Sequence, residues 1–468
     1  MYYRNILKIN SIILFSILIS CEQKVSNSSD ISGIWTQVGY GRLIEIQDST
    51  YTYYNTSESS CLPLAEGELK DRFTVVKLDK DSLILNPGGI VDYQFHRTEE
   101  LPRICSNNKQ VFDNNPVVNF EEFWNTFNNN YAFFEERDID WDKIYQQYRP
   151  RVDSIQSDRE LYELLGEISQ KFQDGHIRLD VPDSLRIKTS KSPTNKPVYS
   201  KTQIQSDILD KYLLSPKEYN NGVLKWGTIR KNDIGYIQIT DMNGFSNYVP
   251  NQNMNSENFE SQYEQRASEN SALKQFRDEI DGVDYIMSKV LEDLQGKKSI
   301  VIDIRFNGGG YETVALKLLS YFVPEQKHIL SIHAKTEMGH TRIQDYLLHP
   351  NENYYKGKIY LLTSDATASA AEMFVLGAKS YPEKITRIGS STNGIFSEIL
   401  WKKLPNNWGY SLSNEMYTDP SGNSFEIKGV FVDINMNYPE NRSKFYDSFY
   451  KNDIFRDVTI EKIINIDE

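Results

Sequence analysis

The feature that most constrains the fold is an alternation of short apolar runs with amphipathic helices in the second half of the chain. Apolar residues recur at helical spacing over 276–294 and again over 314–322, where Pro324 stops the second helix. The apolar runs with the length of buried strands are 236–240, 299–304 and 358–362, and further strands are predicted around 385–388, 398–402 and 409–416. Strands that alternate with helices form largely parallel sheets, because parallel neighbours need a long crossover. The sequence therefore predicts an α/β unit over 224–445.

Two segments with other sequence patterns precede this unit, so we expect an α/β multidomain protein. Short β-branched and aromatic runs separated by Gly, Asp, Ser and Pro fill 31–105, which predicts a small antiparallel β domain. From Pro116, apolar residues at helical spacing predict three helices, the last of which starts after an N-cap at Ser157 and ends near Phe172. The predicted domains are a leader at 1–20, a tether and β domain at 21–110, a helical subdomain at 111–185, a linker at 186–223, the α/β unit at 224–445 and a C-terminal tail at 446–468.

Length and charge limit the classes of function. The chain has 468 residues, more than the roughly 250 to 300 that one hydrophobic core supports. Its net charge of −13, with no cluster of Lys and Arg, argues against a nucleic-acid partner, because such proteins need a basic face. Acidity alone does not name a substrate.

The first twenty residues read as a secretion signal. Arg4 and Lys8 precede a short apolar stretch at 9–20, which is too short to span a bilayer. The stretch ends in Leu-Ile-Ser before Cys21 and resembles the lipobox of bacterial lipoproteins. That resemblance implies a lipid on Cys21 and a protein anchored to a bacterial membrane in the cell envelope. A chance cysteine after an uncleaved signal is the alternative.

Two further cysteines, Cys61 and Cys105, lie in the predicted β domain. An even pair in an exported protein predicts a disulfide within that domain. Two buried free thiols are the alternative, because cysteine packs well as a small apolar residue.

Ser369 is the candidate nucleophile. A serine hydroxyl needs a base, a group that orients the base and donors for the developing oxyanion. Ser369 follows the strand at 358–362 and precedes a helix that starts at Ala370, so its hydroxyl would lie at a helix N-terminus, where amides converge. An ordinary N-cap serine is the alternative.

A glycine-rich turn offers a second source of oxyanion donors. Residues 303–310 read Asp-Ile-Arg-Phe-Asn-Gly-Gly-Gly after a buried strand, and glycines let backbone amides approach a ligand closely. The turn lacks the Gly-Lys-Ser/Thr ending of a P-loop and the spacing of a dinucleotide fingerprint, so nucleotide binding is not expected. Gly309 and Gly310 are therefore candidate donors beside the Ala370 amide.

His176 is the candidate base. Of the six histidines, only His176 has a distinctive setting, in Asp174-Gly175-His176 directly after the third predicted helix. The chain has no H-E-x-x-H, no C-x-x-C and no cluster of His and Cys at ligand spacing. We therefore predict no metal site and no cofactor.

Together these motifs resemble peptidase family S41, and within it the branch of the tricorn core and the interphotoreceptor retinoid-binding protein. The motifs are Asp174-Gly175-His176, the turn at 303–310, Thr-Ser-x-x-Thr-Ala-Ser-Ala-Ala-Glu at 363–372, and Glu426 followed by Lys428-Gly429-Val430 and Asp433. The resemblance implies a ClpP/crotonase-like β/α superhelix with a helical subdomain that delivers the base. It also implies Ser369 as nucleophile, His176 as general base, Glu426 as the carboxylate that orients the histidine, and oxyanion amides from Gly309 or Gly310 and Ala370.

The chain departs from relatives in this family at two places. The tail-specific members use a Ser/Lys dyad, but the segment 389–396 that should carry the lysine contains none, which favours His176 as base. These members also carry a PDZ domain, and no such pattern lies between His176 and Gly235. The tricorn branch has a serine just before the histidine, where this chain has Gly175, so the link from Glu426 to His176 is left open.

We therefore predict a cell-envelope serine peptidase that acts on proteins or peptides without metal or cofactor. The alternative is an inactive relative that binds a peptide or an apolar ligand in the same cleft. A third hypothesis, in which the β domain is the functional surface of the lipoprotein, has less support because no recognition pattern is legible there.

Overall fold

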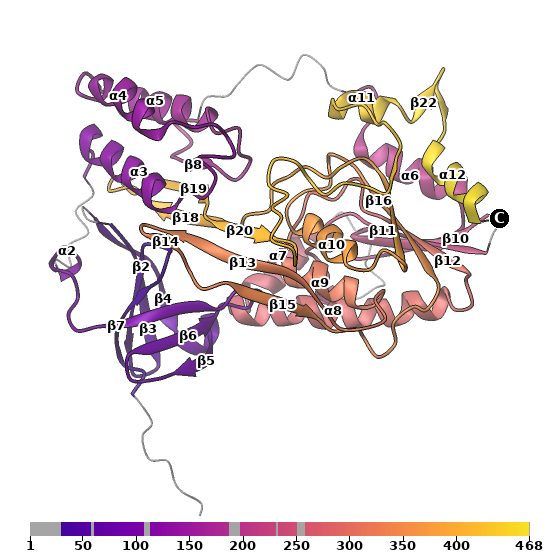
Figure 1. Ribbon diagram of the computed structural model, residues 1–468, viewed down its shortest axis with the longest axis horizontal. Helices are drawn as coiled ribbons and strands as arrows, with labels where there is room; N and C mark the ends of the chain where they lie inside the picture. Colours follow the sequence, from indigo (N-terminus) through magenta and orange to yellow (C-terminus); the bar gives the residue numbers. More distant parts are fainter. Residues whose placement is uncertain are drawn as a thin grey trace, which may run out of the picture.

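The computed structural model describes residues 30–57, 60–106, 113–186, 197–230, 233–249 and 258–467. The leader and Cys21, on which the lipid-anchor prediction rests, lie outside these ranges. No helix within the described ranges is both long and apolar enough to cross a membrane. Figure 1 shows a β domain in indigo and purple, a helical subdomain beside it, and a larger α/β unit in pink to yellow.

The β domain is a seven-stranded antiparallel sheet, as the alternating runs predicted. Its strands, in the spatial order β4-β3-β2-β1-β7-β6-β5, are β1 (Gly33–Gln37), β2 (Arg42–Gln47), β3 (Thr50–Thr56), β4 (Cys61–Glu68), β5 (Thr74–Leu78), β6 (Ser82–Asn86) and β7 (Tyr93–Thr98). Alternate residues of β3 are buried, because successive side chains of a strand point to opposite faces. A disulfide joins Cys61 to Cys105, which confirms the predicted pairing. Two short helices complete the domain, α1 (Leu69–Arg72) and α2 (Arg103–Ser106).

The helical subdomain contains the three predicted helices, α3 (Pro116–Asn130), α4 (Trp141–Val152) and α5 (Asp158–Gln170). Each helix begins at a side-chain cap, and the predicted cap Ser157 accepts a hydrogen bond from the Glu160 amide. Their apolar faces enclose an aromatic core that also includes Tyr410 and Leu412. The latter two residues belong to a small sheet of β18 (Ile399–Lys403), β19 (Gly409–Ser413) and β8 (Arg178–Asp180). The subdomain is therefore packed directly on the C-terminal half of the chain.

The α/β unit is built on a second seven-stranded sheet. Its order is β21 (Ile434–Asn435), β17 (Ile385–Gly389), β16 (Lys358–Thr363), β12 (Ser299–Asp303), β11 (Ile234–Ile239), β10 (Leu224–Ile229) and β9 (Leu213–Tyr219), parallel from β11 to β21. In β12, Ile300 and Ile302 face one apolar core, whereas Val301 faces the other. Because both faces are covered, every residue of the strand is buried and the central residues 300–302 are apolar, which is why the strand was recognisable in the sequence.

Helices cover both faces of this sheet. The first core contains residues of α8 (Ala272–Asp293), α9 (Glu312–Ser320) and α10 (Ala370–Lys379), and the second contains residues of α6 (Lys201–Tyr212), α11 (Arg442–Asp447) and α12 (Val458–Asp467). Helix α7 (Phe259–Ser268) precedes α8. The fold is thus a mixed α/β arrangement, as predicted.

Three segments differ from the prediction. The predicted linker at 186–223 contains α6 and β9, because Ile204 and Ile208 face the core one turn apart and β9 pairs with β10. The predicted tail at 446–468 contains α12, whose Ile460 and Ile463 complete the same core. The sequence prediction also missed a sheet of β13 (Lys327–Thr336), β14 (Gly339–His340), β15 (Gln344–Leu348) and β20 (Glu415–Thr418), as well as the hairpin of β22 (Tyr450–Lys451) and β23 (Ile454–Phe455).

Candidate active site

Ser369 lies at the N-terminus of α10, at the strand-to-helix turn where the sequence placed it. Its backbone has φ 55° and ψ −128°, and its side chain is half-buried. A non-glycine residue with positive φ costs about 1 to 3 kcal/mol, and such residues concentrate at active sites, where the surrounding structure holds them. Ser369 is also the N-cap of α10 and forms a capping box with Glu372, so its position is that of a helix cap with an unusual backbone conformation.

Hydroxyl groups just before Ser369 fasten this turn to the glycine-rich turn. Thr367 Oγ1 donates to Ile304 O at 2.9 Å and accepts the Ser364 amide at 3.0 Å. The Ala368 amide donates to Asn307 O at 3.1 Å. Thr367 and Ser364 are therefore structural residues, and they fix the position of Ser369 relative to the glycine-rich turn at 303–310.

Gly309 packs directly against Ser369, the candidate nucleophile. A Cβ atom on Gly309 would lie 2.6 Å from Ser369 Cβ and 3.1 Å from its Oγ, and the φ of Gly309 is +112°. The Gly309 amide donates to Asn307 Oδ1 at 2.9 Å, so that amide is already engaged. Within the described ranges, the amides of Gly310 and Ala370 have no intramolecular acceptor. Of the three predicted oxyanion donors, these two are uncommitted.

His176 is enclosed in the turn that follows α5. Its amide donates to Asp174 Oδ1 at 2.9 Å, and its carbonyl accepts Ser411 Oγ at 2.6 Å. The ring Nδ1 is shielded from solvent and has no hydrogen-bond partner. Burial lowers the pKa of His176, and this effect outweighs the opposing effect of the Asp174 carboxylate. The imidazole is therefore neutral at neutral pH, as a general base must be.

Glu426 is buried but is not bonded to His176. Its Oε1 accepts Arg137 Nη2 at 2.8 Å and its Oε2 accepts the Phe396 amide at 2.8 Å. Burial raises the pKa of Glu426 to about 8 although both donors oppose this rise. No hydrogen bond among the described residues joins Glu426 to His176, so the direct link that the family resemblance allowed is absent. The carboxylate instead belongs to an ion pair with Arg137.

The residue after Glu426, Ile427, has a strained backbone conformation. Ile427 has φ 68°, and the Lys428 amide donates to Glu426 O at 2.8 Å, which closes a three-residue γ-turn. A β-branched residue at positive φ is rare. The turn is held because the Ile427 amide donates to Gly394 O at 2.7 Å. This strain fixes the direction from which Glu426 enters the site.

Sequence reasoning missed Glu372 as the group that supports the nucleophile. Its buried carboxylate accepts the amides of Ser369 at 3.1 Å, Gly394 at 2.7 Å and Ile395 at 2.8 Å, and the Thr392 hydroxyl at 2.6 Å. Burial raises the pKa of Glu372 to about 7 in spite of these donors. The motif contained this residue, but nothing in it indicated that the carboxylate points inward.

The loop at 390–396 brings the histidine turn next to this carboxylate. A Cβ atom on Gly175 would lie 3.0 Å from Ile395 Cδ1. The Ile395 amide is bonded to Glu372, which also accepts the Ser369 amide. The histidine turn and Ser369 thus have neighbours in common in this loop, and no hydrogen bond among the described residues joins Ser369 to His176.

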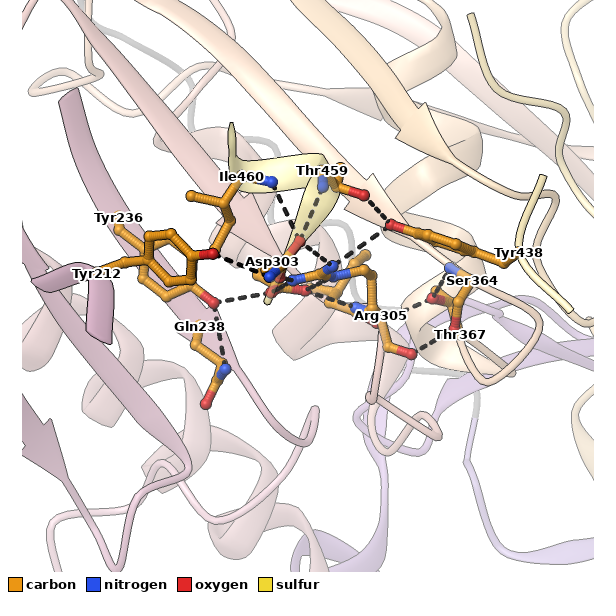
Figure 2. A network of polar contacts seen from close by, with 12 residues as sticks. Tyr212, Tyr236, Gln238, Asp303, Arg305, Ser364, Thr367, Tyr438, Thr459 and Ile460 are labelled. Atoms are coloured by element: carbon orange, nitrogen blue, oxygen red, sulfur yellow. Dashed lines mark hydrogen bonds and ion pairs between the residues drawn. The ribbon is translucent and has the colours of Figure 1, made fainter. Parts of the chain in front are cut away.

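A buried arginine anchors the glycine-rich turn from the other side (Figure 2). Arg305 is fully buried and forms ion pairs at 2.6 Å with Asp303 and with Asp457, which caps α12. Tyr236 donates to Asp303 Oδ2 at 2.7 Å, and Ser364 donates to the Arg305 carbonyl. The C-terminal helix is thus tied to the turn that carries Gly309.

In the part of the chain that the structure describes, no group of three or more His, Cys, Asp or Glu side chains is arranged to hold a metal ion. The chemistry that these residues can perform on their own is nucleophilic attack by Ser369, with His176 as base and amides as oxyanion donors.

Comparison with known families gives the class of protein. Residues 233–436 match the model of peptidase family S41, and residues 112–170 match that of the tricorn protease C1 domain. The first match covers most of the α/β unit, which is therefore similar to the S41 peptidases. The second match extends the likeness to the helices that precede His176.

Individual relatives are distant. The tail-specific protease of Haemophilus influenzae is 26% identical over 166 residues, which cover 33% of this chain and 22% of that protein. The chain thus spans about a fifth of the length of this curated relative. A crystal structure from Parabacteroides merdae, described as that of a candidate peptidase, is 21% identical with a TM-score of 0.55 and covers 76% of this chain and 97% of that one. The tricorn protease structure has a TM-score of 0.38 and 14% identity, and it covers 90% of this chain and 46% of that one.

Proposed function

We propose that the protein is a serine peptidase that hydrolyses peptide bonds of proteins or peptides in the bacterial cell envelope. The observation that carries this proposal is the geometry at Ser369. A serine at positive φ lies against Gly309 at the start of α10, beside the uncommitted amides of Ala370 and Gly310. Residues in strained conformations cluster at functional sites, and free amides beside a serine are suited to hold an oxyanion.

The proposed reaction follows acyl-enzyme chemistry. His176 takes the proton from Ser369 Oγ as this oxygen attacks the carbonyl carbon, and the Ala370 and Gly310 amides stabilise the oxyanion. The C–N bond then breaks, and His176 gives its proton to the leaving amine. Water, deprotonated by His176, next attacks the acyl carbon; the bond from this carbon to Ser369 Oγ then breaks, His176 returns the proton to Oγ, and the acid and free Ser369 are released. Because His176 Nδ1 is shielded, Nε2 is the nitrogen that exchanges the proton.

The envelope location rests on the leader, the lipobox-like residues before Cys21 and the disulfide. The Cys61–Cys105 bond supports an oxidising compartment, where disulfides persist. Cells that express the wild-type chain should incorporate radiolabelled palmitate into it, and Cys21→Ser should abolish this label. A labelled Cys21→Ser protein would contradict anchoring at this residue.

A second candidate is an inactive relative that binds a peptide or an apolar ligand, as suggested by the resemblance to the retinoid-binding branch. The observation that favours it is that Glu426 pairs with Arg137 instead of His176. The shielded, unpartnered Nδ1 of His176 has no carboxylate of the kind that orients the base in a Ser-His-Asp triad.

Labelling with a fluorophosphonate probe separates the two functions. Wild-type protein should react covalently, and Ser369→Ala should not, because the probe traps only an activated serine. Ser380→Ala is a matched control, since Ser380 lies at the opposite end of the same helix, α10. Folded wild-type protein that resists the probe and cleaves nothing in a peptide library would refute the peptidase proposal.

A further inference from the structure

Arg137 is a buried cation that touches both sides of the candidate site. It lies in the turns after α3, and its side chain is only 8% exposed. Its Nη2 donates to Glu426 Oε1 at 2.8 Å and lies 3.9 Å from Asp174 Oδ2. The guanidinium therefore lies between two buried carboxylates, one from the motif of the base and one from the C-terminal part of the chain.

The other end of the guanidinium fixes the turn that leads to the histidine. Arg137 Nη1 donates to the carbonyls of Phe172 at 3.1 Å and Gln173 at 2.9 Å. Gln173 has φ 49°, so the chain turns sharply there at a conformational cost. Asp174 follows directly, and its Oδ1 accepts the His176 amide at 2.9 Å. The Arg137 side chain thus contacts both the strained turn at Gln173 and the Asp174 carboxylate, which accepts the His176 amide.

Tyr131 completes the group from α3. Its hydroxyl donates to Asp174 Oδ2 at 3.1 Å, so both carboxylate oxygens of Asp174 are occupied. The charged groups that face His176 are Asp174 on its own turn, Arg178 on β8 and Arg137, with Glu426 beyond Arg137. Asp174 raises the pKa of His176, whereas Arg178 and Arg137 lower it.

We propose that Arg137 is a positioning residue for the histidine base and that it takes the place of the hydroxyl that Gly175 lacks. It connects Glu426 to the His176 turn and fixes the backbone on which the imidazole stands. A guanidinium suits this task because its planar fork presents five donors, which a lysine cannot match. The inference rests on the proposed peptidase function for its kinetic consequences but not for its effect on His176.

The decisive measurement is the titration of His176 by NMR in protein labelled at histidine, with His176→Asn used for assignment. Arg137→Ala should raise the pKa of His176, because a neighbouring cation that disfavours the imidazolium is lost. Arg137→Gln, which keeps a donor but not the charge, should raise it as well. An unchanged His176 titration in both folded variants would overturn the proposal. This arm needs no activity, so it remains decisive even if the peptidase proposal fails.

Kinetics supply the second arm. If the wild type hydrolyses peptides, Arg137→Ala should lower kcat about 10²-fold with little change in KM, because only the positioning of the base is lost. The acid limb of its pH profile should move to higher pH, and added guanidinium chloride should restore part of the rate where equal NaCl does not. Arg149→Ala is the matched control: Arg149 pairs with Glu121 at 2.6 Å and with Asp153 at 2.8 Å on the same subdomain, away from the turn. It should leave both the rate and the His176 titration unchanged. A rate loss without a shifted pH profile or rescue would assign Arg137 a merely structural role.

Discussion

Substitution of Gly309 by alanine should inactivate Ser369 without unfolding the chain. The added Cβ would lie 2.6 Å from Ser369 Cβ and 3.0 Å from Ala368 O. Apolar atoms rest about 3.5 to 4.0 Å apart, so the nucleophile or the turn must move by about 1 Å. A misplacement of about 1 Å costs on the order of 10²-fold in rate, or about 2.7 kcal/mol of transition-state stabilisation. The φ of +112° adds strain, because this region disfavours any side chain.

The same glycine run contains the matched control. A Cβ atom on Gly308 would meet nothing within 4 Å. Gly308→Ala should therefore react with a fluorophosphonate at the wild-type rate, whereas Gly309→Ala should react about 10²-fold more slowly. Thermal unfolding of both variants checks that they are folded. If folded Gly309→Ala is labelled as fast as the wild type, the packing of this glycine on the nucleophile does not set its reactivity.

Three further predictions concern stability. Asp457→Asn removes one of the two carboxylates that hold the fully buried Arg305, so denaturant titration should show a loss of about 3 to 5 kcal/mol in the free energy of unfolding, and a loss below about 1 kcal/mol would contradict the role of this pair. Burial raises the pKa of Glu372 from 4.5 to about 7, so the folded state binds more protons than the unfolded state in this window. Stability should therefore fall as pH rises through it, by up to about 1.4 kcal/mol per unit, and Glu372→Gln should flatten this part of the profile. The Cys61–Cys105 disulfide spans a sequence separation of 44, so chain entropy predicts that Cys61→Ser costs about 4 kcal/mol, whereas equal unfolding midpoints with and without reductant would refute that value.

The parts of the fold that the sequence predicted are those with a regular apolar period. Strand β12 is buried at every position and apolar over 300–302 because both faces are covered, and α5 has a clear amphipathic face behind a serine cap. Helix α6 and strand β9 were taken for a linker because their exposed residues are rich in Lys, Ser and Gln, and the few core residues such as Ile204 are diluted among them. Helix α6 and strand β9 form because they pack against the rest of the fold, and a local sequence pattern does not reveal that packing.

The site was predictable only where a motif marks it. The positions of Ser369 and of the glycine turn followed from a strand, a turn and a helix in order. Arg137 carried no signal, because its neighbours Glu135, Glu136 and Asp138 read as an exposed charged turn. Its partners come from residues 172–174 and from Glu426, and only the folded chain brings these segments to one place. Buried polar contacts between residues that are distant in the sequence produce no periodic sequence pattern that could be recognised.

The segment 389–396, which lacks the lysine of the Ser/Lys dyad, instead bonds to two buried carboxylates of the candidate site. Its consecutive amides serve two buried carboxylates in turn, since Gly394 and Ile395 donate to Glu372 and Phe396 donates to Glu426. A Cβ atom on Gly394 would lie 2.5 Å from the Ile427 carbonyl carbon, so the space beside Gly394 is too small for any side chain at this position. Glu372 also accepts the amide of Ser369, and Glu426 is paired with Arg137, so this loop links the groups around both carboxylates. The segment that should carry the lysine of a dyad here bonds both buried carboxylates through its backbone amides.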